Sequence, residues 1–190
     1  SARGTDAAQL DSALDAAVTA LQRVLGADVF SVDGASLEAV VGARLRERGL
    51  TVALAESCTG GLAAGRLTAV PGSSSYVRGG VVAYSNDVKA QVLGVPTALL
   101  ASVGAVSEPV AAAMAEGVRR VLGADIGVGI TGIAGPDGGT EEKPVGTVCF
   151  SVAGPGSQVH TFTRRLPGDR EHVRRWAVVV ALDAVRRAVL

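Results

Sequence analysis

The stretch from Thr51 to Gly61 constrains the fold of this chain more than any other. Mostly apolar residues end there in the polar run Glu56-Ser57-Cys58-Thr59, two glycines follow, and a small-residue helical pattern covers 62–70. This order predicts a buried strand, a tight turn and a helix N-terminus. Because a helix start presents free N–H groups, a hydroxyl beside it can serve as a helix cap, a phosphate contact or a nucleophile next to an oxyanion hole.

The composition favours a globular core made of small aliphatic side chains. The chain has 190 residues, of which 48% are hydrophobic but only 3% are aromatic, so Ala, Val and Leu must fill the interior. A formal net charge of zero and the scarcity of aromatics weigh against nucleic-acid binding. The two cysteines, Cys58 and Cys149, are far apart and indicate neither a disulfide framework nor a zinc site.

Helical and strand patterns alternate along the chain until a hairpin appears late. Helices are expected over 7–25, 37–48, 62–70, 86–94, 96–103, 110–122 and 170–189, and strands over 50–55, 77–84, 125–131, 145–152 and 159–165. Ser36, Ser85, Ser107 and Asp169 are the expected N-caps. The order predicts an α/β fold, a three-layer α/β/α arrangement with a mixed sheet.

Residues 1–35 differ from the rest of the chain. They offer one amphipathic helix and, over 27–32, a short strand or an extended connector, which cannot form a core by themselves. We therefore expect an N-terminal appendage at 1–35 and the main domain at 36–190. The apolar strip of the helix (Leu10, Leu14, Leu21) needs a cover that a second subunit could supply, so a homo-oligomer is expected.

A second polar cluster is Tyr84-Ser-Asn-Asp-Val-Lys89. A lone lysine is usually a surface charge, but partial burial would lower its pKa, and a neutral lysine can act as the base for a serine nucleophile. Tyr84 could relay a proton or hold a substrate, or could simply end a strand. The sequence alone leaves these alternatives open.

Two further clusters could contact an anion. The loop from Thr131 and Gly132 to Pro144 is rich in glycine and could cradle a phosphate with backbone amides, although a flexible surface loop is an equal alternative. Arg170 and Arg174 lie in the first turns of the last helix. A cation is unfavourable at a helix N-terminus, which suggests an anion contact, with a salt bridge or a solvated side chain as the alternatives.

No motif indicates a metal, a cofactor or a membrane. His160 and His172 have no ligand partners at useful spacing and are interpreted as structural. No signal peptide or membrane-length apolar run is visible, so no membrane partner is expected and the cytoplasm is the expected compartment.

Taken together, these motifs resemble the CinA C-terminal domain family, whose enzymes are called nicotinamide-nucleotide amidases (PncC). The resemblance covers roughly 36–189. The motifs that carry it are Ala55-Glu-Ser-Cys-Thr-Gly-Gly61, Tyr84-Ser-Asn-Asp-Val-Lys89, Gly104-Ala-Val-Ser-Glu-Pro109, Gly132-Ile-Ala-Gly-Pro-Asp-Gly-Gly139, Glu142-Lys-Pro-Val-Gly-Thr147 and Gly168-Asp-Arg170. Residues 1–35 resemble the stretch that joins this domain to a preceding domain in longer CinA proteins.

The resemblance implies hydrolysis of the carboxamide of nicotinamide mononucleotide to nicotinate mononucleotide and ammonia, without metal or cofactor. Ser57 matches the nucleophile and Lys89 the base, and Tyr84 is a further catalytic candidate. The expected substrate-binding residues are Thr59, Gly60, Gly61, Thr131, Gly132 and Arg170. Three alternatives stay open: Cys58 as the nucleophile, another amide substrate, and a non-catalytic nucleotide-binding or competence-related and DNA-damage-related interaction module.

Overall fold

The computed structural model describes residues 6–155 and 158–190, and within them a mixed five-stranded sheet forms the centre of the molecule. The strands are β1 (Val52–Glu56), β2 (Val77–Val82), β3 (Ile126–Gly132), β4 (Thr147–Ala153) and β5 (Val159–Arg165), in the order β2-β1-β3-β4-β5. β1 runs parallel to β2 and β3, whereas β4 pairs antiparallel with both β3 and β5. The expected mixed sheet is confirmed.

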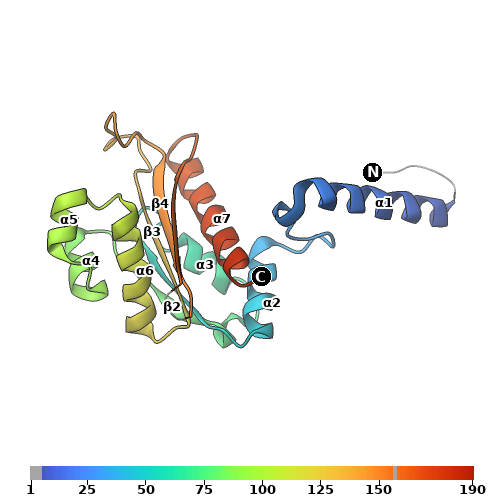
Figure 1. Ribbon diagram of the computed structural model, residues 1–190, viewed down its shortest axis with the longest axis horizontal. Helices are drawn as coiled ribbons and strands as arrows, with labels where there is room; N and C mark the ends of the chain where they lie inside the picture. Colours follow the sequence, from blue (N-terminus) through green and yellow to red (C-terminus); the bar gives the residue numbers. More distant parts are fainter. Residues whose placement is uncertain (1–5, 156–157) are drawn as a thin grey trace.

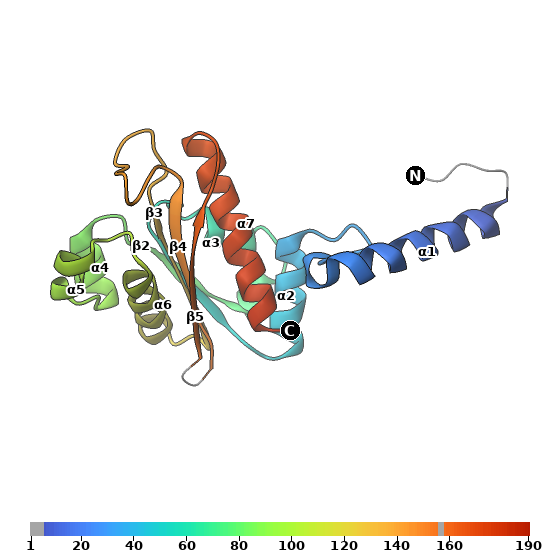
Figure 2. The ribbon, with the colours of Figure 1, turned by 45° about the horizontal axis from the view of Figure 1, so that its top comes forward.

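Helices cover both faces of the sheet (Figures 1 and 2). One face carries α4 (Asn86–Leu93), α5 (Thr97–Val103) and α6 (Glu108–Leu122), and the other carries α2 (Leu37–Glu47), α3 (Leu62–Thr68) and α7 (Arg170–Ala188). Side chains of β1 alternate between the two layers, because Val52 and Leu54 belong to the α2–α3–α7 core while Ala53 and Ala55 belong to the α4–α6 core. The expected three-layer α/β/α arrangement is confirmed.

Small side chains let the helices pack close to the sheet. The chain has few aromatic side chains that could fill a wider gap between these layers. At Gly129 in β3, a Cβ atom would collide with the backbone of α6 at Ala111 and Ala115. Glycine is therefore needed there to seat α6 against the centre of the sheet. This contact also fixes β3, whose carboxyl end contributes to the site described below.

The first helix, α1 (Ala7–Leu25), has no buried residue and projects from the rest of the molecule (Figures 1 and 2). A 3₁₀ turn at Gly26–Asp28 follows, without a strand over 27–32, so the connector alternative holds for this segment. Arg186 donates to the carbonyl of Ala27 and Arg187 pairs with Asp28, which fixes the connector on α7. Residues 1–5 of the expected appendage lie outside the described residues.

Across the described ranges, no helix combines the length and apolarity that crossing a bilayer requires.

The element boundaries follow the sequence expectations within a few residues, but one predicted cap is wrong. Ser107 occupies the N-cap position of α6, yet its hydroxyl donates to the carbonyl of Gly104 at 2.9 Å instead of capping the helix. The hydroxyl reaches this carbonyl because Gly104, the C-cap residue of α5, lies only three residues earlier in the chain. The other three caps form: Ser36 accepts from Ala39 N at 3.4 Å, Ser85 from Val88 N at 3.2 Å, and Asp169 from His172 N at 2.9 Å.

Candidate active site

Polar residues gather at the carboxyl ends of the parallel strands β1, β2 and β3, where α/β sheets commonly bind ligands. A cavity of about 230 Å³ opens there. Its lining includes Ser57 and Cys58 after β1, Tyr84 and Lys89 after β2, and Thr131 and Gly132 at the end of β3. Arg170 contributes from the first turn of α7. Of the nine expected catalytic and binding residues, six therefore line one cavity.

Ser57 and Lys89, the expected nucleophile and base, lie within hydrogen-bonding distance of each other in this cavity. The Nζ atom of Lys89 lies 3.2 Å from the Oγ atom of Ser57, 2.8 Å from the carbonyl oxygen of Ala83 and 3.1 Å from that of Tyr84. A neutral amine has two N–H donors and one lone pair, so donation to the two carbonyls leaves the lone pair for the serine hydroxyl. The surroundings of Nζ thus suit a base that accepts the Ser57 proton.

Burial adjusts Lys89 to this role. Its side chain is only 1% exposed, and this desolvation lowers its pKa from the ordinary lysine value. Lys89 lies in the first turns of α4, which Ser85 caps, and a helical side chain leans toward its helix N-terminus. That direction leads back to the ends of β1 and β2. The surface-charge alternative for Lys89 is wrong.

The turn after β1 owes its shape to Glu56, which the sequence interpretation did not single out. The buried carboxylate of Glu56 accepts the backbone amides of Gly61 at 3.0 Å, Ala63 at 3.1 Å and Ala64 at 2.8 Å. Glu56 therefore caps α3. The helix-cap role, one of the three possibilities for the Ser57 hydroxyl, thus belongs to Glu56 instead. An acidic residue just before a helix start was the available sequence signal, since the helix dipole favours a negative charge there.

Gly60 and Gly61 serve the backbone of the same turn. Their φ angles are 62° and 94°, values that other L-residues rarely adopt. Neither glycine lines the cavity, and Thr59 is also outside its lining. The Gly60 amide donates to the Ser57 carbonyl at 3.1 Å, and the Gly61 amide is taken by Glu56. These three expected binding residues thus adjoin Ser57 in the chain but are not among the residues that line the cavity.

Cys58 lacks the activation that a nucleophile needs. It is 5% exposed, and burial, reinforced by the nearby charge of Glu56, raises the pKa of its thiol to about 12. Because the thiolate is the reactive form, a thiol with this pKa is inert near neutral pH. Cys58 lines the cavity beside Ser57, but the expectation that a helix start would activate its thiol is wrong.

Arg170 connects three segments at the mouth of the cavity. Its guanidinium donates to the carbonyl of Gly135 at 2.8 Å and to the hydroxyl of Tyr84 at 3.2 Å. Tyr84 is 61% exposed, so its hydroxyl lies near solvent while its carbonyl holds Lys89. Thr131 is buried, and its hydroxyl donates to the carbonyl of Ala105 at 2.9 Å. Arg170 thus makes neutral contacts within the protein, and the salt-bridge alternative does not describe them.

The glycine-rich loop that follows β3 is tied down at several points. Arg170 holds Gly135 from α7, and the Nζ atom of Lys143 donates to the carbonyl of Val103 at 2.8 Å. At its two ends, the Ile133 amide donates to Thr147 O and the Gly146 amide to Ile133 O, both at 2.8 Å. The loop and the start of α7 lie at the same end of the molecule (Figures 1 and 2). Ala134 of this loop is among the residues that line the cavity.

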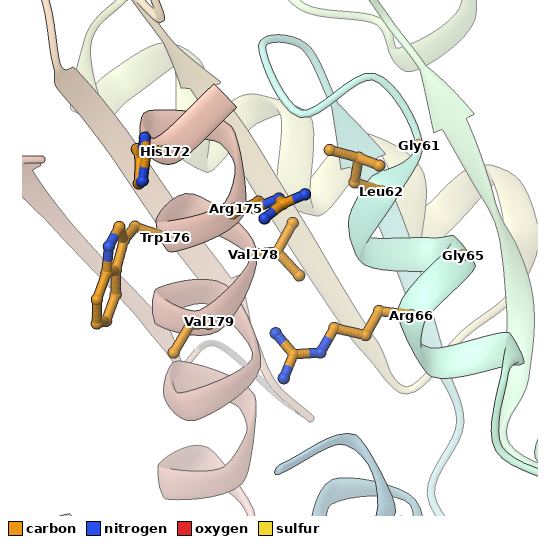
Figure 3. Close-up of a pocket in the computed structure, with 9 residues that line it drawn as sticks. All are labelled: Gly61, Leu62, Gly65, Arg66, His172, Arg175, Trp176, Val178 and Val179. Atoms are coloured by element: carbon orange, nitrogen blue, oxygen red, sulfur yellow. The ribbon is translucent and has the colours of Figure 1, made fainter. Parts of the chain in front are cut away.

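A larger hollow of about 530 Å³ lies between α3 and α7, away from the Ser57–Lys89 pair. Leu62 and Arg66 of α3 face Arg175 and Val178 of α7 across it (Figure 3). Gly61 is its only lining residue among those expected to bind substrate, and the nucleophile and base do not line it. The Ser57–Lys89 pair therefore belongs to the smaller cavity.

The histidines take structural positions in the described part of the chain. His172 pairs with Asp169 at 2.9 Å in the first turn of α7, and His160 packs beside the ring of Phe162 on β5. In residues 6–155 and 158–190, no three His, Cys, Asp or Glu side chains come together as a metal-binding group.

Comparison with known sequences finds matches along most of this chain. The sequence model of the CinA C-terminal domain matches residues 34–189. A CinA-like protein from Gemmatimonas aurantiaca is 52% identical over 94% of this chain and 41% of its own length. A CinA-like protein from Anaeromyxobacter dehalogenans is 58% identical over 87% of this chain and 40% of its own length. The chain thus spans about 40% of the length of these curated relatives.

Solved structures show the same fold. The competence/damage inducible protein CihA from Agrobacterium tumefaciens superimposes with a TM-score of 0.79 and 40% identity, covering 85% of this chain and 98% of that one. A competence-damaged protein (CinA) superfamily protein from Klebsiella pneumoniae gives a TM-score of 0.78 at 38% identity, covering 80% of this chain and 95% of that one.

Proposed function

This chain belongs to the CinA C-terminal domain family, and from that premise we propose that it hydrolyses the carboxamide of nicotinamide mononucleotide to nicotinate mononucleotide and ammonia. The observation that carries the proposal is the 3.2 Å approach of a buried Lys89 amine to the Ser57 hydroxyl. Residues 36–190 are the catalytic domain in this proposal, and residues 1–35 are an appendage. The homo-oligomer expected from the apolar strip of α1 stays a prediction.

The reaction begins with acyl transfer to Ser57. The Lys89 lone pair takes the serine proton while Oγ attacks the carboxamide carbon, which gives a tetrahedral intermediate with an oxyanion. Lys89 then passes the proton to the leaving nitrogen, the C–N bond breaks, and ammonia departs. Water, deprotonated by Lys89, attacks the resulting ester, and the acid and the free Ser57 hydroxyl are released. Water is the only co-reactant in this scheme: the acylation of Ser57 releases ammonia, and the hydrolysis of the ester consumes one water molecule and restores Ser57.

The cavity fits the reacting part of such a substrate. Its volume of about 230 Å³ is below the range of about 300–1,000 Å³ typical of sites that enclose whole ligands. It suits the pyridine ring and its carboxamide, with Thr131 and Gly132 on its wall, while the ribose phosphate extends outward. Arg170 and Tyr84 stand at the exposed mouth and are the candidates for contacting that part of the substrate.

The test is incubation of the purified chain with nicotinamide mononucleotide, with ammonia and nicotinate mononucleotide both measured. Equal amounts of the two products support the proposal. Calorimetric binding of the nucleotide without ammonia release would favour the non-catalytic interaction module instead. Ammonia released only from other carboxamides would keep the Ser57–Lys89 chemistry and change the substrate.

A further inference from the structure

Arg174 contacts the nucleophile turn from outside the cavity, and nothing in the mechanism above uses it. Its Nε atom donates to the carbonyl of Cys58 and its Nη2 atom to the carbonyl of Thr59, both at 3.0 Å. We propose that Arg174 is a positioning residue that turns the amide of Thr59 into the oxyanion site, with Glu56 fixing the other end of the turn. The inference rests on the amidase function proposed above.

The amides of this turn leave few candidates for the oxyanion site. Those that already have partners are Ser57 N (Ile130 O, 2.9 Å), Gly60 N (Ser57 O, 3.1 Å), Leu62 N (Thr59 O, 3.3 Å), and Gly61 N, Ala63 N and Ala64 N (the Glu56 carboxylate). Among the hydrogen bonds of the described residues, the amides of Cys58 and Thr59 have no oxygen acceptor, and only the Cys58 thiol, a weak acceptor, interacts with them. They are therefore the donors that this turn can offer to a tetrahedral intermediate.

The planar peptide bond connects Arg174 to one of these amides. In a trans peptide the carbonyl and the following N–H point in opposite directions. The Cys58 carbonyl is held by Arg174, so the N–H of Thr59 is directed away from Arg174. Cys58 and its neighbour Ser57 line the cavity and Arg174 does not, so we infer that the Thr59 amide lies on the Ser57 side of the turn.

Two charged groups hold the turn from its two ends. The Glu56 carboxylate, 1% exposed, binds amides at the start of α3, while the Arg174 guanidinium binds carbonyls just after Ser57. Hydrogen bonds to charged groups are stronger than neutral ones, and the guanidinium fork fixes two acceptors at once. Because Glu56 occupies the N-terminus of α3, the oxyanion depends on the Thr59 amide, whose peptide Arg174 holds, rather than on the helix end.

The test compares Arg174→Met with Arg175→Met. The first variant keeps most of the side-chain stem and loses the donors, while the second removes the neighbouring arginine of α7, which is exposed and pairs with Glu171. Both are assayed for kcat and KM on nicotinamide mononucleotide, for the pH profile and for thermal unfolding. We expect kcat of Arg174→Met to fall about 10- to 100-fold, less than the loss of a whole oxyanion donor. KM should stay unchanged, because Arg174 does not line the cavity. The fall of activity at low pH should also stay unchanged, because Lys89 is untouched. Arg175→Met should match the wild type in all of these measurements.

Arg174→Lys provides a second variant should Arg174→Met fail to fold, because it keeps the charge but cannot donate to both carbonyls in a fork. Its kcat should also fall while KM holds. A folded Arg174 variant with wild-type kcat, a change confined to KM, or an equal loss in Arg175→Met would overturn the inference. Failure of the wild-type chain to release ammonia would instead overturn the proposed function, so the two failures are distinguishable.

Discussion

Lys89 and Cys58 show how burial has opposite consequences for neighbouring reactive groups. Desolvation disfavours the charged form of either side chain. It lowers the pKa of the Lys89 amine, which moves the lysine toward the neutral form that a base requires, and it raises the pKa of the Cys58 thiol to about 12, which removes the thiolate. The same burial therefore favours the serine–lysine pair over the cysteine.

The first prediction concerns the dependence of kcat/KM on pH. Lys89 acts only when neutral, so activity should fall as the pH drops through its folded-state pKa and should level off above it. Since burial lowers that pKa from 10.5, the acid limb should lie below 10.5. Ammonia release is measured across a pH series in overlapping buffers, and the pH at which kcat/KM falls to half its plateau gives the position of the acid limb. An activity that keeps rising through pH 10.5 would contradict a buried neutral lysine.

At the scale of elements, the strand–turn–helix unit from β1 to α3 was predictable because its signals are local. The apolar run, the two glycines and the small helical residues lie next to one another in the sequence. What those signals could not decide is which polar side chain caps α3. Glu56 and Ser57 are adjacent, and only the packing of β1 directs the Glu56 carboxylate to the helix start.

The second prediction tests that cap. Glu56→Ala would leave the buried amides at the start of α3 without an acceptor, so the free energy of unfolding should fall by about 2 kcal/mol or more. Urea unfolding measures the change. Glu171→Ala is the control, because its exposed pair with Arg175 should contribute less than about 1 kcal/mol. Similar losses in the two variants would show that the Glu56 contacts do not stabilise the fold as described.

At the scale of the whole molecule, the site is assembled from segments that are distant in the sequence. Ser57 follows β1, Lys89 lies on α4, and Arg170 and Arg174 come from α7. The layered fold and the pair Ser57–Lys89 could be expected from pattern and family resemblance. The contacts of α7 with Tyr84 and Cys58 could not, because they depend on how the last helix packs beside α3.

The third prediction concerns the projecting helix. Because α1 contributes no buried residue, a chain that begins at Gly26 should unfold at the same temperature as the full chain and release ammonia at the same rate. Gly26 is chosen as the start because Ala27 and Asp28 contact Arg186 and Arg187. Calorimetric unfolding and the ammonia assay compare the two chains. A loss of activity on truncation would show that α1 supports the site, for instance by holding a second copy.

The most direct test of catalysis by the Ser57–Lys89 pair is the rate of ammonia release from nicotinamide mononucleotide by the wild-type chain, Ser57→Ala and Cys58→Ala. Ser57→Ala should lose activity by a factor of about 10³ or more, in line with the removal of other catalytic nucleophiles. Cys58→Ala should stay close to the wild-type rate, since its thiol is protonated and unused. Wild-type turnover by Ser57→Ala, or loss of turnover in Cys58→Ala alone, would contradict catalysis by this pair.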